Sequence, residues 1–167
     1  MTEKQKILID GLINALPEEK ETFREIAEYA VSLGYLPNKL SKDGTYIAFS
    51  KSKVSRTIMK VMALYNECID AHGVPCLYLN FYATKKYSEL FQRGVRKVIE
   101  HFGGVYLTEC NGCGKCDGIG YPDPDGKGRI KCGNELVELP PISFENVAEI
   151  KSLLKAQDEY FVQHFSK

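Results

Sequence analysis

The chain has 167 residues, 44% of them hydrophobic and 26% charged, which fits one domain with a buried core. Lysine plus arginine and aspartate plus glutamate both total 22, so no overall charge attracts the protein to nucleic acid or anionic lipid. No apolar run reaches the length of a membrane span or a signal peptide. We therefore expect a cytoplasmic protein without a membrane partner, in a reducing compartment where thiols stay free.

Two helices and a hairpin are predicted in the first 50 residues. Apolar residues at helical spacing indicate a helix over residues 7–16, and Pro17 followed by two glutamates opens a second helix that ends at Gly34. Residues 35–40 and 45–49 flank a Lys-Asp-Gly turn, which is typical of a short β-hairpin. A sheet is therefore expected to begin after the helical pair.

The next segment, residues 54–72, is predicted to be a helix. Its apolar residues recur at three- and four-residue spacing, whereas a strand would place charged and apolar side chains on one face. Residues 77–83 alternate apolar side chains with aromatic or polar ones, and this alternation predicts a strand. The expected order here is therefore a helix over residues 54–72 followed by a strand over residues 77–83.

The second half of the chain continues the mixture of helices and strands. The pattern predicts a helix over residues 87–102, a strand over 105–107, an extended segment over 136–141 and a last amphipathic helix over 144–165. Together these elements indicate a single α+β domain, residues 1–167, with a small, mainly antiparallel sheet covered by helices. A cysteine-bearing excursion, residues 110–133, is expected before the last helix.

Four cysteines in that glycine-rich excursion predict a metal site. The run Cys110-Asn-Gly-Cys113-Gly resembles the knuckle of zinc-ribbon proteins, in which a two-residue spacer lets two thiolates face one ion. Unlike a zinc ribbon, this chain has Arg129 three residues before Cys132, and Cys116 takes the place of that ligand. Turn-forming residues and a short strand precede Cys132, so the fourth cysteine can return to the first three. Because a closed set of four thiolates leaves no open position, we expect a structural zinc.

Two other interpretations of the four cysteines stay open. The Cys-x-x-Cys-x-x-Cys run with a distant fourth cysteine also resembles iron–sulfur ligation, although Gly133 stands where bacterial ferredoxins have proline. A disulfide pair or a redox couple is the third interpretation, for which four cysteines are an excess. Zinc is the preferred cofactor, and an iron–sulfur cluster is the alternative.

Basic residues cluster in two segments despite the balanced total. Residues 34–60 hold six cations and one acid, and residues 85–97 hold five cations and one acid. If the helices predicted in these segments lie side by side, their surfaces form one anion-binding region. The residues expected to contact a ligand there are Tyr78, Tyr82, Lys85, Lys86 and Arg93. A solvated surface explains the same charges, and nucleic acid is not the favoured partner because the spacing of a helix-turn-helix motif is absent.

No arrangement of nucleophile, base and oxyanion donor is recognisable, so the sequence predicts no enzyme class. We expect a non-enzymatic binding or regulatory module, in which zinc stiffens a surface that recognises a small molecule or a protein. The alternative is a small-molecule sensor or an enzyme with an anion pocket beside Tyr78 and Tyr82.

Overall fold

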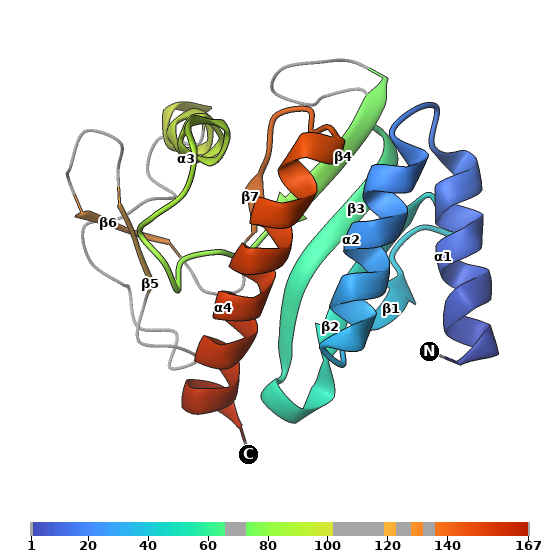
Figure 1. Cartoon of the computed structure of the whole chain (residues 1–167), viewed down its shortest axis with the longest axis horizontal. Helices are drawn as coiled ribbons and strands as arrows, with labels where there is room; N and C mark the ends of the chain where they lie inside the picture. Colours follow the sequence, from blue (N-terminus) through green and yellow to red (C-terminus); the bar gives the residue numbers. More distant parts are fainter. Residues whose placement is uncertain (1, 66–72, 102–118, 123–127, 132–135, 167) are drawn as a thin grey trace.

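The structure, a computed structural model, describes residues 2–65, 73–101, 119–122, 128–131 and 136–166. These residues form a five-stranded sheet and a layer of helices on one of its faces (Figure 1). The helices are α1 (Glu3–Ala15), α2 (Lys20–Ser32), α3 (Glu89–His101) and α4 (Val147–Phe165), with 3-10 turns η1 (Ser52–Val54) and η2 (Phe144–Asn146). The main sheet contains β1 (Leu36–Lys39), β2 (Tyr46–Lys51), β3 (Arg56–Tyr65), β4 (Val74–Leu79) and β7 (Val137–Glu138), and β5 (Ile119–Pro122) pairs with β6 (Gly128–Lys131). The predicted α+β class, with an antiparallel sheet covered by helices, is confirmed.

The predicted helical pair is confirmed as α1 and α2. A capping box begins α1: the Gln5 N–H donates to the Thr2 hydroxyl (3.3 Å), and the Thr2 N–H donates to Gln5 Oε1 (2.7 Å). Helix α2 ends where Gly34 adopts φ +90°, a conformation that glycine takes without strain. Both helices bury one apolar stripe, including Leu12 and Phe23, against the sheet.

The predicted hairpin is confirmed as β1 and β2, and Asp43 holds its turn. Asp43 Oδ1 accepts hydrogen bonds from the Ser41 hydroxyl (2.7 Å) and from the Thr45 N–H (3.0 Å) and hydroxyl (2.8 Å). These donors, the Ser41 hydroxyl first, stabilise the carboxylate and lower the pKa of Asp43 to about 2. The turn thereby fixes the register in which β1 pairs with β2.

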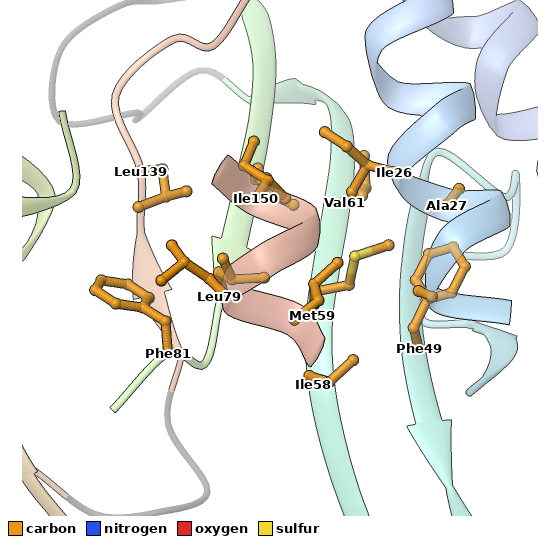
Figure 2. Packing of buried hydrophobic residues seen from close by; sticks show 14 of the residues in the cluster. Ile26, Ala27, Phe49, Ile58, Met59, Val61, Leu79, Phe81, Leu139 and Ile150 are labelled. Atoms are coloured by element: carbon orange, nitrogen blue, oxygen red, sulfur yellow. The ribbon is translucent and has the colours of Figure 1, made fainter. Parts of the chain in front are cut away.

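The main sheet is antiparallel throughout, in the order β1-β2-β3-β4-β7. One row of register partners crosses all five strands on the helix-covered face, and every member is buried: Pro37, Phe49, Met59, Leu79 and Val137. Figure 2 shows Phe49, Met59 and Leu79 on neighbouring strands, in one cluster with Ile26 of α2 and Ile150 of α4. This face of the sheet therefore carries the hydrophobic core.

Residues 56–65 form strand β3, so the predicted helix is wrong over this part of residues 54–72; residues 66–72 lie outside the described ranges. A β-bulge explains the error. Phe49 pairs with Met59 but Ser50 pairs with Thr57, which leaves Ile58 as an extra residue on β3. Because Ile58 and Met59 are both fully buried, the two-residue alternation of a strand is broken and the apolar spacing resembles that of a helix.

Asn80 satisfies the backbone at this bulge from the end of β4. Its N–H donates to the Ile58 carbonyl (2.9 Å), and its side-chain Nδ2 donates to the Thr57 carbonyl (3.0 Å). Its Oδ1 accepts a long hydrogen bond from the Tyr121 hydroxyl of β5 (3.4 Å). Asn80 is 1% exposed, and a buried amide is stable there because its polar groups have partners. The side chain therefore links the main sheet to the β5–β6 hairpin.

Both edges of the main sheet are protected. The Leu40 N–H donates to the Tyr46 carbonyl (2.8 Å), and the alternation of antiparallel pairs then turns the backbone of Pro37 away from β2. The missing N–H of Pro37 therefore removes no bond from the ladder. At the other edge α3 packs on β7 so closely that a Cβ at Gly94 would lie 3.0 Å from the Glu138 carbonyl oxygen.

The predicted last helix is confirmed as α4, which holds the segment after β4. The Ala83 N–H donates to Gln157 Oε1 of α4 (3.0 Å). Tyr160 and Phe161 of the same helix pack edge-on to the Tyr82 ring, with centroids 5.3 and 6.0 Å away. The chain that leaves β4 is therefore fixed on the helix-covered side of the sheet.

A polar network also joins α4 to β2 on this side. Lys51 Nζ lies 2.7 Å from Asp158 Oδ1 and donates to the Leu33 carbonyl (2.9 Å), and the Tyr35 hydroxyl donates to the same Asp158 oxygen (3.0 Å). Burial first, and the charge of Asp158 second, raise the pKa of Tyr35 far above its usual range. The network fixes the end of α2, the end of β2 and α4 relative to one another.

Candidate functional site

The four predicted metal ligands, Cys110, Cys113, Cys116 and Cys132, lie outside the described residues. The zinc site therefore stays a prediction. Within the described ranges, no three cysteine, histidine, aspartate or glutamate side chains lie close enough together to hold a metal ion. Strands β5 and β6 are the described parts of the predicted excursion, and their placement bears on how its two ends approach each other.

The β5–β6 hairpin stands between the third and fourth cysteines in the sequence. The first residue of β5, Ile119, is the register partner of the last residue of β6, Lys131. This pairing confirms that the chain runs back as a strand before the fourth cysteine. Two residues separate Cys116 from Ile119 and none separates Cys132 from Lys131, so both cysteines are close in sequence to the paired ends.

Tyr121 anchors this hairpin in the main core. Its side chain is 1% exposed, and its ring packs edge-on to Phe81 and Tyr82, with centroids 5.6 and 5.8 Å away. Its hydroxyl donates to the buried Asn80. A burial of this size makes a single tyrosine worth about 2 kcal/mol or more to the docking of the hairpin.

The structure does not bring the two predicted stacking tyrosines to one surface. Tyr82 is 7% exposed, and its ring is enclosed by aromatic residues of α4 and β5 on the helix-covered side. Tyr78 is half-buried and pairs with Lys60 and Glu138 in the row next to the buried one, on the opposite face of the sheet. Of the two, Tyr78 is therefore the one placed for contact with a ligand.

The predicted anion contacts Lys85, Lys86 and Arg93 are exposed. The two lysines precede α3, and Arg93 lies on it. Helix α3 packs on β7, whereas the cations of residues 34–60 lie on β1, β2, β3 and the turns between them. Because residues 56–65 form a strand, the two neighbouring basic helices on which the combined anion-binding region depended are not present.

The face of the main sheet opposite the helices carries a second row that crosses all five strands. In register order its members are Asn38, Ala48, Lys60, Tyr78 and Glu138. Four of them are exposed or half-buried, and Ala48 lies low between taller neighbours at 4% exposure. Helices α1, α2 and α4 pack on the other face and α3 packs on β7 (Figure 1). We call this surface the open face, because none of the helices that the structure describes packs on it; it also includes the adjacent row of half-buried Tyr46 and Met62 and buried Cys76.

The open face combines aromatic rings with a cation. Lys60 Nζ lies 5.9 Å from the centroid of the Tyr46 ring, within the range of a cation–π contact. Burial, followed by the Coulombic effect of Cys76, raises the pKa of Tyr46, so its hydroxyl is a hydrogen-bond donor at neutral pH. Tyr46, Lys60 and Tyr78 stand on three adjacent strands. Such a surface can stack flat groups and bind anionic ones.

Sequence reasoning identified Tyr78 and missed its neighbours Tyr46 and Lys60. The residues of β2 carry a usable signal, because Ile47 and Phe49 alternate with more polar or smaller side chains. Because the pattern predicts a helix over residues 54–72, no strand is expected between β2 and β4. Lys60 counts there among the cations of residues 34–60, for which both an anion-binding region and a solvated surface are open interpretations.

No family model, no curated protein and no solved structure matches this chain. None of the helices that the structure describes is long and apolar enough to cross a membrane. A functional conclusion must therefore come from the open face and from the chemistry of the four cysteines.

Proposed function

We propose that this chain is a non-enzymatic binding module, with the open face as its recognition surface and a structural zinc ion held by its four cysteines. The observation that carries the proposal is the contrast between the two faces of one sheet. One face buries the core, whereas the other presents Tyr46, Lys60 and Tyr78 at or near the surface. Large aromatic and apolar side chains grouped on an exposed face are typical of interaction sites.

The β5–β6 hairpin supports the zinc part of the proposal. A tetrahedral site needs ligands from both ends of the excursion, and the pairing of Ile119 with Lys131 brings the two flanking chains together. Tyr121 holds this hairpin against Phe81 in the core, so an ion bound beside it would be fixed relative to the main sheet. The ion would then have a structural role, because four thiolates leave no coordination position for a substrate.

Metal analysis of the purified protein, combined with its absorbance spectrum, tests the zinc site. We expect about one zinc per chain and no colour. Stoichiometric iron and sulfide with broad visible absorbance would establish the cluster instead, and four thiols or disulfides without metal would reject both. Cys113→Ser and Cys132→Ser should release the ion, while Cys76→Ala, a substitution in β4, should keep it.

Hydrogen exchange separates a structural ion from an incidental one. After loss of zinc, protection should fall in β5 and β6 but persist in α2 and α3, because these helices have apolar stripes packed in the core. Unchanged protection in β5 and β6 would contradict a structural role for the ion.

Site-specific photo-crosslinking in cells tests the recognition surface. A photoreactive residue at Met62 lies on the open face, and one at Lys155 lies on the exposed side of α4 as the matched control. We expect a discrete adduct from Met62, none from Lys155, and loss of the Met62 adduct on Lys60→Glu. Equal adducts from both positions, or none from Met62, would reject the open face as a recognition surface.

A further inference from the structure

A groove runs from the open face around the β1 edge of the sheet. It consists of two surface pockets, of about 440 Å³ and about 370 Å³, that share Leu36 and Asn38 of β1. The larger pocket lies between the start of α1 and β1. The smaller one lies between β1 and the turn from β2 to β3, and its lining residues Leu36, Ser50 and Thr57 are register partners on three adjacent strands. Asn38 lines both pockets and belongs to the open face, so the groove borders that face.

The groove is basic although the chain as a whole is neutral. The described residues that line its two pockets include Lys4, Lys39, Lys51 and Arg56 and no aspartate or glutamate. The Arg56 guanidinium stacks on the Phe165 ring of α4, 4.0 Å from its centroid, and donates to the Ser55 carbonyl (3.2 Å). The charge of Lys51 is already neutralised by Asp158, 2.7 Å away. Lys4 and Lys39 are exposed, and neither forms an ion pair with any residue that the structure describes. An anionic partner is therefore the one whose charge complements this surface.

Hydroxyl groups and an exposed lysine surround the smaller pocket. Ser50, Ser52, Ser55 and Thr57 line it, and Lys53 stands exposed beside it in η1. Serine and threonine hydroxyls, together with lysine ammonium groups, are common donors to phosphate oxygens. Ser50 Oγ and Thr57 Oγ1 share one hydrogen bond (2.8 Å), and the Ser55 hydroxyl donates to the Ser52 carbonyl (3.3 Å). The groups that can still donate to a phosphate here are therefore Ser52, one hydroxyl of the Ser50–Thr57 pair and Lys53.

The spacing of the two open-face tyrosines favours an extended ligand with more than one ring. Tyr46 is on β2 and Tyr78 is on β4, so one strand separates them and their backbones lie about 10 Å apart across the sheet. One flat group cannot stack on both rings at this separation. Two successive bases can, and antiparallel sheets with aromatic side chains on one face are established platforms for unstacked bases.

We propose that the open face and the β1 groove bind a single strand of RNA or DNA, an inference that rests on the proposed function. Tyr46 and Tyr78 stack on two bases, and Lys4, Lys39 and Lys53 contact phosphates along the groove. The neutral net charge, which made nucleic acid an unfavoured partner from the sequence, limits the binding to this one surface. With three phosphate contacts, the logarithm of the association constant should fall with the logarithm of salt concentration with a slope of roughly 2.

Fluorescence anisotropy with labelled single strands of about 12 nucleotides, a length within the usual site sizes, tests the inference. Lys39→Gln combined with Lys53→Gln should reduce the salt slope by roughly 1.4. The matched control, Lys20→Gln with Lys155→Gln, removes two exposed lysines outside the groove and should leave the slope unchanged. Loss of a stacked base in Tyr78→Leu should weaken binding about tenfold without changing the slope, and Tyr29→Leu in α2 should not weaken it.

The failure of this inference is distinguishable from the failure of the proposed function. No binding of single strands at low salt would overturn the inference, as would equal binding of duplex DNA and heparin that is insensitive to Tyr78→Leu. If Met62 then still crosslinks to a protein or a small molecule, the open face remains a recognition surface with another partner. If Met62 gives no adduct and no strand binds, both proposals are wrong.

Discussion

The two faces of the main sheet are made of the same strands and differ in almost every physical property. Met59 and Met62 are three residues apart on β3, yet Met59 is fully buried under the helices and Met62 is half-buried on the open face. Pairing with β2 and β4 decides which face each side chain joins, since a shift of one residue would exchange the two sets. The register therefore separates the residues that stabilise this fold from those available for binding.

The two methionines give the largest expected difference between the faces. Met59→Ala removes a buried side chain from the core row and should lower the free energy of unfolding by about 2–5 kcal/mol. Met62→Ala removes a half-buried side chain, with a loss of about 1 kcal/mol or less. Urea unfolding of both variants measures the difference. Equal losses would show that the open face is covered as thoroughly as the other.

The ion pair between Lys51 and Asp158 tests whether polar groups on the helix-covered side matter as much as apolar ones. The two side chains are 17% and 15% exposed, so Asp158→Ala leaves a largely buried ammonium and should cost about 2–3 kcal/mol. Lys151 and Glu25 form a comparable pair, 2.8 Å long, whose side chains are 29% and 43% exposed.

Glu25→Ala is the matched control, because both pairs join α4 to a neighbouring element. It should cost less than about 1 kcal/mol, as for a solvent-screened pair. Chemical denaturation compares the two variants, and a cost for Asp158→Ala no larger than that for Glu25→Ala would mean that the network adds no stability.

Replacing each of two helical glycines by alanine compares the stability cost at the edge of the sheet with that on an exposed helix surface. Gly94→Ala would place a Cβ 3.0 Å from the Glu138 carbonyl oxygen, so α3 must shift away from β7 at a cost of about 1–2 kcal/mol. A Cβ at Gly11 in α1 meets nothing within 4 Å, and Gly11→Ala should stabilise the protein by about 0.5–1 kcal/mol. Thermal unfolding should therefore show shifts of opposite sign. A stabilising Gly94→Ala would mean that α3 does not depend on close contact with β7.

Alkaline pH should distinguish a tyrosine under the helices from one on the open face. The folded state keeps the Tyr35 proton, whereas tyrosine in the unfolded chain ionises near pH 10, so stability is complete below about pH 10 and falls above it. The slope is about 1.4 kcal/mol per pH unit for one such tyrosine. Burial raises the pKa of Tyr87 to about 12, which adds to the loss between about pH 10 and 12.

Tyr35→Phe should remove most of the pH dependence that one tyrosine adds to the free energy of unfolding above about pH 10. Tyr46→Phe, at the half-buried position on the open face, should remove less. Urea titrations at several pH values between about 8 and 11 give the slopes. Identical slopes in the native protein and in Tyr35→Phe would contradict the burial of a protonated Tyr35.

Local patterns in the sequence were sufficient to predict most of the fold. Both amino-terminal helices, the hairpin around Asp43 and the last helix were predictable because each has its own apolar stripe, cap or turn residues. Strand β3 was not, because its bulge places Ile58 and Met59 on the same side. A bulge depends on the partner strand, which no local window contains.

The candidate site was less predictable than the fold, because it depends on register. The row from Asn38 to Glu138 joins residues that lie 100 positions apart in the sequence. Tyr78 and Tyr82 look equivalent as a pair four residues apart, but the chain leaves β4 between them and turns the second ring into the core. The cysteines are the opposite case, since their chemistry and spacing alone predict a ligand set.

Both edges of the main sheet limit how another chain can associate with it. At β1 the outward-facing backbone of Pro37 has no N–H to donate, and β7 has two residues with α3 against them. Neither edge presents the long, flat row of donors and acceptors that templates strand addition and fibre growth. The main sheet therefore resists polymerisation through its edges, although its open face is partly apolar. A partner must approach that face from above and be recognised by side chains.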